Sequence, residues 1–201
     1  FAEGKMSSRK GNIISAEEFI ADMEAAIDEK MKDREFSPEE RAEVRRDVAI
    51  AAVKYTILRQ AIGTDIIYDK EKSVSFEGDS GPYLQYACVR AGNVVAKAKA
   101  AGIKGPGFFR KIKTPLQVTL LEKMLARFPE VTDRARTEYA PQHIVTYLTE
   151  LAAAFNANYA ENQIVDEKNP ESAYRVELTK AFVNVMKNGL WLLGIRVPKR
   201  M

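Results

Sequence analysis

Hydrophobic residues recur at helical spacing along most of the chain, and the clearest stretch runs from Asp79 to Gly102. Asp79 or Ser80 can cap the free N–H groups at its start, and Pro82 stands where a first helical residue belongs. The apolar positions that follow recur at helical spacing: Leu84, Ala87, Cys88, Ala91, Val94, Val95 and Ala98. This pattern predicts an amphipathic helix that ends near Gly102.

The part of the chain before this helix is predicted to mix helix and strand. Ser15-Ala-Glu-Glu18 and Ser37-Pro-Glu-Glu40 are capping-box patterns, and each is followed by an apolar helical stripe. The second helix is expected to reach Gly63. Two short β-prone segments come next, at 64–68 and 73–76, and these are predicted as the last strand-like pieces.

The part of the chain after Gly102 is predicted to be helical throughout. Thr114-Pro-Leu-Gln117 forms a third capping-box pattern, and shorter and longer apolar stripes follow at 131–139 and 141–162. Asn169 is expected to cap the last helix, with Pro170 in its first turn and Gly194 at its end. Antiparallel helices joined by short loops form a bundle, so the fold class is mainly α.

The composition is that of a soluble globular protein. Of 201 residues, 46% are hydrophobic and 29% are charged, and the net charge is only +3. The single cysteine, Cys88, excludes an internal disulfide and lies on an apolar stripe, which favours a buried thiol in a reducing, cytoplasmic environment. No apolar run approaches the roughly 18 residues of a membrane span. No secretory signal is visible and the chain begins with Phe1, so we expect a piece of a longer protein.

One segment is locally basic, although the net charge of the whole chain is small. Between Ser80 and Leu121 the sequence has no Asp or Glu. The window has seven basic residues: Arg90, Lys97, Lys99, Lys104, Arg110, Lys111 and Lys113. Such a local excess indicates a surface for a polyanion, usually nucleic acid, although a solvated basic face is the alternative. Tyr83 and Tyr86 could stack on unpaired bases or pack in the core, and helical spacing favours partial exposure of Tyr83.

The same window contains two adjacent phenylalanines, and the chain has a single histidine outside it. Phe108 and Phe109 are expected to pin their loop to the core, with base stacking as the alternative. His143 stands near a helix start without a Cys or carboxylate cluster at ligand spacing. The sequence therefore gives no support for zinc chemistry or for a Ser/His/Asp triad.

The first twelve residues have a composition suited to phosphate binding. Lys5, Arg9 and Lys10 supply charge, Ser7 and Ser8 supply hydroxyl groups, and the neighbouring glycines allow close approach of the backbone. A mobile terminal tail is the alternative interpretation of this segment.

Four motifs, in order along the chain, resemble arginyl-tRNA synthetases. Lys5-Met-Ser-Ser-Arg9 is similar to the KMSKS signature of class I aminoacyl-tRNA synthetases, and Asp79-Ser-Gly-Pro-Tyr-Leu-Gln-Tyr-Ala87 resembles the stretch that opens the family's anticodon-binding domain. The segment 147–159 resembles that domain's central helix, and 188–201 resembles the closing helix and C-terminal end. The resemblance extends over nearly the whole chain.

The resemblance implies two regions. Residues 1–78 would be the end of a Rossmann-like catalytic domain with connecting helices, and 79–201 the helical anticodon-binding domain. The parent enzyme would attach arginine to its tRNA with ATP and magnesium, as a monomer. Its HIGH signature would lie upstream, so we expect this chain alone not to activate arginine. A free-standing helical RNA-binding or interaction module without catalytic activity is the alternative.

The resemblance also implies roles for individual residues. Lys5 would steady the ATP phosphates during adenylate formation, with no protein-bound metal site. The predicted ATP-binding residues are Lys5, Met6, Ser7, Ser8, Arg9 and Lys10. The predicted tRNA-binding residues are Tyr83, Gln85, Tyr86, Arg90, Lys97, Tyr147, Asn156, Tyr159, Trp191 and Met201. Two departures stand out: Ser8 replaces the signature's second lysine, for which Arg9 or Lys10 would substitute, and Cys88 replaces a frequent histidine.

Overall fold

Helices make up all the regular secondary structure in the residues that the structure describes. It is a computed structural model, and it describes residues 15–66, 68–103 and 118–201. The helices in these ranges are α1 (Ala16–Lys30), α2 (Pro38–Leu58), α3 (Lys70–Ser73), α4 (Gly81–Ala100), α5 (Leu120–Ala126), α6 (Phe128–Thr137), α7 (Gln142–Glu161) and α8 (Ser172–Leu192). The predicted fold class, mainly α, is confirmed.

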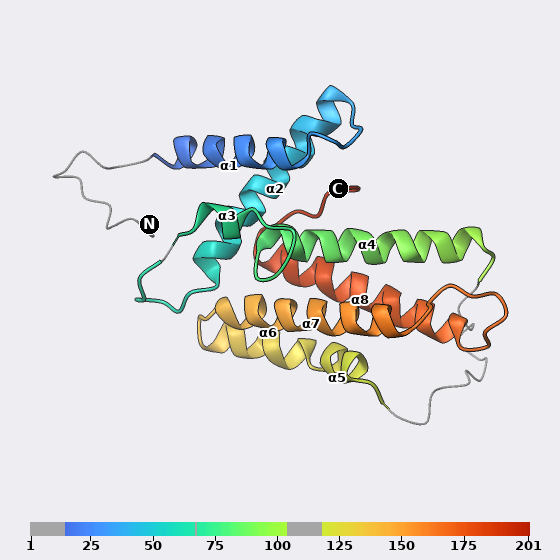
Figure 1. The fold of residues 1–201 in the computed structure, drawn as a ribbon. Coiled ribbons are helices and arrows are strands. Elements are labelled where there is room, and N and C mark those ends of the chain that lie inside the picture. The colour runs from blue at the N-terminus through green and yellow to red at the C-terminus, as the bar shows by residue number, and fades with distance from the viewer. Residues whose placement is uncertain (1–14, 67, 104–117) are drawn as a thin grey trace.

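The helices form a bundle with a helical hairpin set on one side of it (Figure 1). The bundle contains α4 and α7, which run in the same direction, α8, which runs opposite to both, and the shorter α5 and α6. The hairpin is α1 and α2, and α2 continues from the hairpin down to the bundle. The expected bundle is therefore present, although its neighbours are not all antiparallel.

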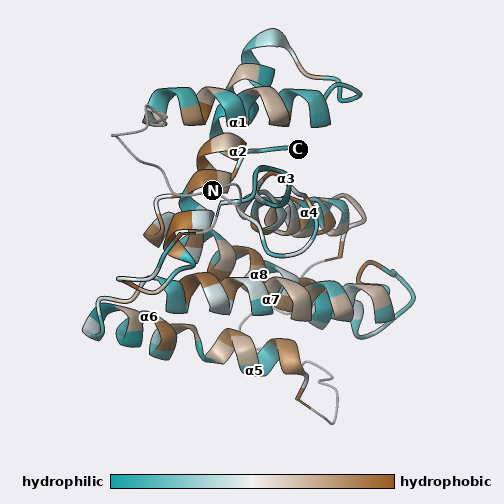
Figure 2. Ribbon diagram, turned by 60° about the vertical axis from the view of Figure 1, so that its left-hand side comes forward, coloured by the Kyte–Doolittle hydropathy of each residue, from teal (hydrophilic) through white to brown (hydrophobic). Residues whose placement is uncertain are grey.

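Two hydrophobic clusters hold the fold together, and α2 contributes to both. The larger cluster joins the bundle helices and includes the fully buried rings of Phe155 and Phe182, with Tyr55 from α2. The smaller cluster joins α1 and α2 around Ile27 and Val48. Hydrophobic stretches alternate with polar ones along the helices in Figure 2, as expected where one face of each helix is buried.

The predicted starts of α1, α2 and α4 are confirmed by hydrogen bonds. Ser15 and Glu18 form a reciprocal capping box, while Ser37 caps α2 by accepting from the backbone N–H of Glu40. Of the two candidates at α4, Ser80 is the cap: its hydroxyl oxygen accepts from the Tyr83 N–H at 3.0 Å. Gly102 follows α4 with a φ of 71°, a conformation that favours glycine over residues with a side chain.

The prediction of strand-like pieces at 64–68 and 73–76 is wrong for the residues described there. This region forms turns and the single-turn helix α3, which Asp69 caps by accepting from the N–H of Lys72. A strand needs a neighbour to accept its backbone hydrogen bonds, and here no other strand is available in the described ranges. The β-prone side chains of Val74 and Phe76 pack instead against the smaller hydrophobic cluster.

Two predicted boundaries in the second half also need correction. The proposed cap at 114–117 lies outside the described residues and stays a prediction, while α5 begins after Thr119, which forms a capping box with Glu122. Helix α6 begins at Phe128, so Pro129 lies in its first turn. Asn169 does not cap α8 but stands two residues before its N-cap, Glu171, whose N–H it accepts at 2.9 Å. Among the described helices, none is long and apolar enough to cross a bilayer.

Candidate nucleic-acid interface

Five of the predicted tRNA-binding residues lie along the line where α4 meets α7. Tyr83, Arg90 and Lys97 come from α4, and Asn156 and Tyr159 come from α7. Two contacts connect the helices: the Asn156 amide donates to the Tyr83 hydroxyl oxygen at 2.9 Å, and the Arg90 guanidinium lies 4.3 Å from the Tyr159 ring centroid. We call these five residues the α4–α7 surface.

Helical spacing explains why these residues share a face. Tyr83, Arg90 and Lys97 are seven residues apart, which is close to two helical turns, and Asn156 and Tyr159 are three apart. The other side of α4 carries small and apolar residues that are buried in the bundle, such as Leu84 and Ala91. The contacts of Tyr83 with Asn156 and of Arg90 with Tyr159 show that the two polar faces are adjacent.

The exposure and polarity of the α4–α7 surface suit a polar ligand. Lys97 is exposed, and Tyr83, Arg90, Asn156 and Tyr159 are partly exposed. The side-chain oxygen of Asn156, Oδ1, is buried and accepts no hydrogen bond from the described part of the chain. Cation–π contact with Arg90 holds the Tyr159 ring in place, which lowers the entropy cost of stacking another group on it.

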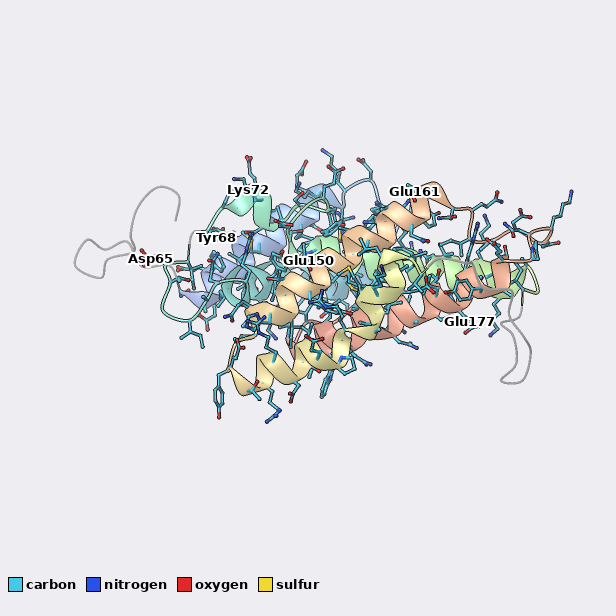
Figure 3. All side chains as sticks on the ribbon, turned by 90° about the horizontal axis from the view of Figure 1, so that it is seen from below. Asp65, Tyr68, Lys72, Glu150, Glu161 and Glu177 are labelled. Carbon is cyan, nitrogen blue, oxygen red and sulfur yellow. The ribbon has the colours of Figure 1, made fainter. Side chains whose placement is uncertain are left out.

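A cavity at the C-terminal end of this surface adds residues that the sequence did not identify. It has a volume of about 320 Å³ and is lined by Lys97, Tyr159, Asn162 and Gln163, among others. Figure 3 places Glu161, at the same end of α7, far from Asp65, Tyr68 and Lys72 at the other end of the molecule. The sequence did not identify these two amides because Asn162 is the last residue of the predicted segment 141–162 and Gln163 lies beyond it, so neither belongs to a motif.

Three other predicted residues lie apart from the α4–α7 surface. Tyr86 is partly exposed, and its ring meets Phe76 edge-on at 6.5 Å. Trp191, near the end of α8, is 75% exposed beside a groove between α2 and the C-terminal residues. Met201 packs partly against the smaller hydrophobic cluster. The structure therefore divides the predicted set between different parts of the molecule.

Gln85 and Tyr147 do not fit direct contact with RNA, and this corrects the sequence-based assignment. Gln85 is completely buried, and its amide donates to two backbone carbonyl oxygens within the protein. Tyr147 is 3% exposed, and its hydroxyl group donates to the Met124 carbonyl oxygen at 2.9 Å. Burial also raises the pKa of the Tyr147 hydroxyl to about 12. The Gln85 amide nitrogen and the Tyr147 hydroxyl group are therefore bonded inside the fold. The Gln85 Oε1 atom is buried too and accepts no hydrogen bond from the residues that the structure describes.

The predicted ATP-binding loop lies outside the described residues. This applies to Lys5, Met6, Ser7, Ser8, Arg9 and Lys10, and also to the basic loop with Lys104, Arg110, Lys111, Lys113 and the two phenylalanines. Both assignments stay predictions. Within the described ranges, no group of three His, Cys, Asp or Glu side chains is arranged to hold a metal ion. His143 contacts Glu138, with its Nε2 2.7 Å from a carboxylate oxygen.

The Cys88 thiol is expected to be inert in the folded protein. It is buried, and burial raises its pKa from about 9 to about 11, a shift that Lys187 opposes slightly. Because the folded pKa is higher, the thiol's contribution to stability is complete below pH 9 and is lost as the pH rises through 11.

We therefore expect two results for Cys88. At pH 8 a thiol-reactive dye should label the folded protein at least tenfold more slowly than the urea-unfolded protein. Between pH 9 and pH 11 the free energy of unfolding should fall by on the order of 2 kcal/mol, and Cys88→Ala should flatten this decrease. Equal labelling rates for the folded and unfolded chains would contradict the buried position.

The sequence of this chain is similar to those of known proteins. A family model described as the DALR anticodon binding domain matches residues 84–201. Curated arginine–tRNA ligases match nearly the whole chain: those of Borrelia hermsii and Pyrococcus furiosus are each 32% identical, and that of Methanospirillum hungatei is 35% identical. In each case 99% of this chain is covered, against 34%, 33% and 35% of the relative.

Two solved structures are similar as well. Thermus thermophilus arginyl-tRNA synthetase matches with a TM-score of 0.77 and 27% identity, over 99% of this chain and 34% of that one. Plasmodium falciparum arginyl-tRNA synthetase matches with a TM-score of 0.68 and 16% identity, over 92% of this chain and 32% of that one, which shows the shared fold. The chain spans about a third of the length of these relatives. With its helical bundle and the match over 84–201, the chain belongs to the DALR anticodon-binding domain family.

Proposed function

We propose that the chain is part of an arginine–tRNA ligase and that its bundle binds the anticodon arm of the tRNA. The relatives named as arginine–tRNA ligases support this proposal, since they match over 99% of the chain. The parent protein would join arginine to its tRNA with ATP and magnesium. It would work as a cytoplasmic monomer.

The α4–α7 surface is the proposed RNA contact. The observation that carries it is the pair of contacts that joins Tyr83 to Asn156 and Arg90 to Tyr159 across two helices. Tyrosine rings stack on unpaired bases, an arginine or lysine neutralises phosphate, and an amide bonds to base edges. Lys97 adds charge beside the 320 Å³ cavity. Tyr86, Trp191 and Met201 stay proposed contacts outside this surface, whereas Gln85 and Tyr147 are left out.

The ATP-binding segment is proposed on the signature pattern alone. Lys5 would stabilise the negative charge that develops on the phosphates, and Ser7 and Ser8 would donate hydrogen bonds to phosphate oxygens. Met6, Arg9 and Lys10 complete the proposed loop. The division into 1–78 and 79–201 is likewise a proposal, in which the first region adjoins the catalytic site and the second binds RNA.

Titration of the chain with tRNA tests the RNA part. We expect tighter binding to arginine tRNA than to the same tRNA with an altered anticodon, and weaker binding as the salt concentration rises. Tyr159→Ala is expected to weaken binding about 5- to 100-fold, the value of one lost base stack. Arg90→Ala should weaken binding and reduce the slope of log K against log salt by about 0.7–0.9.

A matched control is available on another helix. Arg136 on α6 has a side chain that is 73% exposed and pairs with Asp133, and Arg136→Ala should leave tRNA affinity within about twofold. If Tyr159→Ala and Arg136→Ala weakened binding equally, the α4–α7 surface would not be the contact. Equal, weak binding of both tRNAs would favour a helical interaction module without anticodon recognition.

A further inference from the structure

The C-terminal tail, residues 195–201, crosses α2 and connects the two hydrophobic clusters. It follows Gly194, which ends the turn after α8 with a φ of 66°. Ile195 is buried in the larger cluster and Val197 packs against it, whereas Met201 packs against the smaller cluster. The tail therefore forms a strap from the bundle to the α1–α2 hairpin, as the path of the C-terminus in Figure 1 shows.

Side-chain contacts hold both ends of the tail against the rest of the molecule. At its start, the Lys54 ammonium group on α2 donates to the Gly194 carbonyl oxygen. At its end, Arg200 donates to the Glu35 carbonyl oxygen and lies 4.9 Å from the Phe36 ring centroid. Arg34 donates to the Met201 carbonyl oxygen at 3.3 Å. These contacts are exposed or partly exposed, so each contributes little alone.

Gln85 supplies the buried contact in the middle of the arrangement. Its side chain is completely buried, and its Nε2 donates to the Arg196 carbonyl oxygen at 2.6 Å and to the Asp47 carbonyl oxygen at 3.2 Å. One amide group from α4 therefore binds the tail and α2 together. Helices α4 and α2 are close enough for this contact because Gly81, one turn earlier on α4, lies directly against the backbone of α2 at Ala51.

We propose that Gln85 is a positioning residue that fastens the C-terminal tail across α2 and thereby fixes the α1–α2 hairpin relative to the RNA-binding bundle. The buried amide donates to backbone carbonyl oxygens, so its contact with the tail does not depend on the identity of the tail's side chains. Helix α4 also carries Tyr83 and Arg90, so the same helix holds the tail and presents the proposed RNA contacts. The effect on RNA binding rests on the proposed function; the effect on the tail does not.

The test compares two substitutions in the full 201-residue chain. Gln85→Met keeps the length and approximate volume of the side chain but removes both N–H donors. Gln60→Met makes the same chemical change at a partly exposed position after α2. Amide hydrogen exchange should accelerate about two- to tenfold in the tail and in α1 of Gln85→Met, the value of one lost hydrogen bond, and stay unchanged in Gln60→Met.

Uniform acceleration across all helices of Gln85→Met would overturn the proposal, because it would show a general loss of stability. Unchanged exchange in the tail would overturn it as well. If Gln85→Met does not fold, Lys54→Met weakens the attachment of the same tail from a partly exposed position. It must then accelerate exchange in the same regions by a smaller factor, and unchanged exchange there would overturn the proposal.

Binding to arginine tRNA provides the second readout. Gln85→Met should weaken binding about two- to tenfold. In a chain that ends at Ile195, the same substitution should have no further effect, because the tail that it releases is absent. Additive losses would overturn the positioning role. If the unaltered chain bound no tRNA at all, the proposed function would be wrong, and the exchange experiment would still decide how Gln85 acts.

Discussion

Replacing Gly81 by alanine is expected to destabilise the protein by about 3 kcal/mol, although alanine is normally the better helix former. A Cβ atom at Gly81 would lie 2.5 Å from the Ala51 carbonyl carbon and 3.0 Å from the Ala52 nitrogen. Both atoms belong to the backbone of α2, which cannot rotate away as a side chain would. The added methyl group must therefore push α4 away from α2, at the crossing where Ala51 is fully buried.

Gly92, on the same helix, is the matched control. A Cβ atom there would have nothing within 4 Å, so Gly92→Ala should stabilise the protein by about 0.5–1 kcal/mol through helix propensity alone. Urea unfolding, followed by circular dichroism, gives both free energies. If the two alanine variants had equal stability, the close approach of α4 and α2 would not exist.

The sequence predicted the helices well because their hydrophobic period and caps are local signals. Ser15, Ser37 and Ser80 cap the helices that follow them, and Cys88 is buried where the apolar stripe placed it. The requirement for glycine at position 81, by contrast, does not come from neighbouring residues in the sequence. In the sequence Gly81 stands between a cap and a proline, but its requirement comes from α2, thirty residues earlier. Spacing along a helix cannot show how closely another backbone approaches.

The same distinction explains the mixed result for the predicted site. Tyr147 stands beside Leu148 and within about one turn of Ile144 and Leu151, so its buried position is compatible with helical spacing. Its assignment to RNA came from the resemblance to the family's motif and not from this spacing. Gln85 follows Leu84 on the inner side of α4, and its backbone partners on α2 and in the tail explain why an amide is needed there. By contrast, the interval of seven residues that relates Tyr83 and Arg90 was available in the sequence and places both on one face.

Replacing Phe182 by alanine is expected to destabilise the protein by about 3–5 kcal/mol, the cost of deleting a buried aromatic ring. Phe182 on α8 and Phe155 on α7 are both completely buried, and their rings stack with centroids 4.1 Å apart at 13°. The loss combines removed apolar area with the cavity left between two long helices, neither of which can collapse without moving the other. Leu192→Ala, on the same helix but at a position 49% exposed, should cost less than about 1 kcal/mol.

The two phenylalanines should differ in their effect on RNA binding, because only one supports the proposed contact. The Phe155 ring lies 6.1 Å from the Tyr159 ring, one turn along α7, and Tyr159 is the residue that Arg90 covers. At temperatures where both variants remain folded, Phe155→Ala should therefore weaken tRNA binding more than Phe182→Ala.

The double variant should lose less stability than the sum of the two single losses, by about 0.5–1.5 kcal/mol, which is the coupling of a stacked pair. A loss of stability below 2 kcal/mol for Phe182→Ala would contradict the stacked core. Equal tRNA affinities of Phe155→Ala and Phe182→Ala would show that Phe155 does not support the α4–α7 surface.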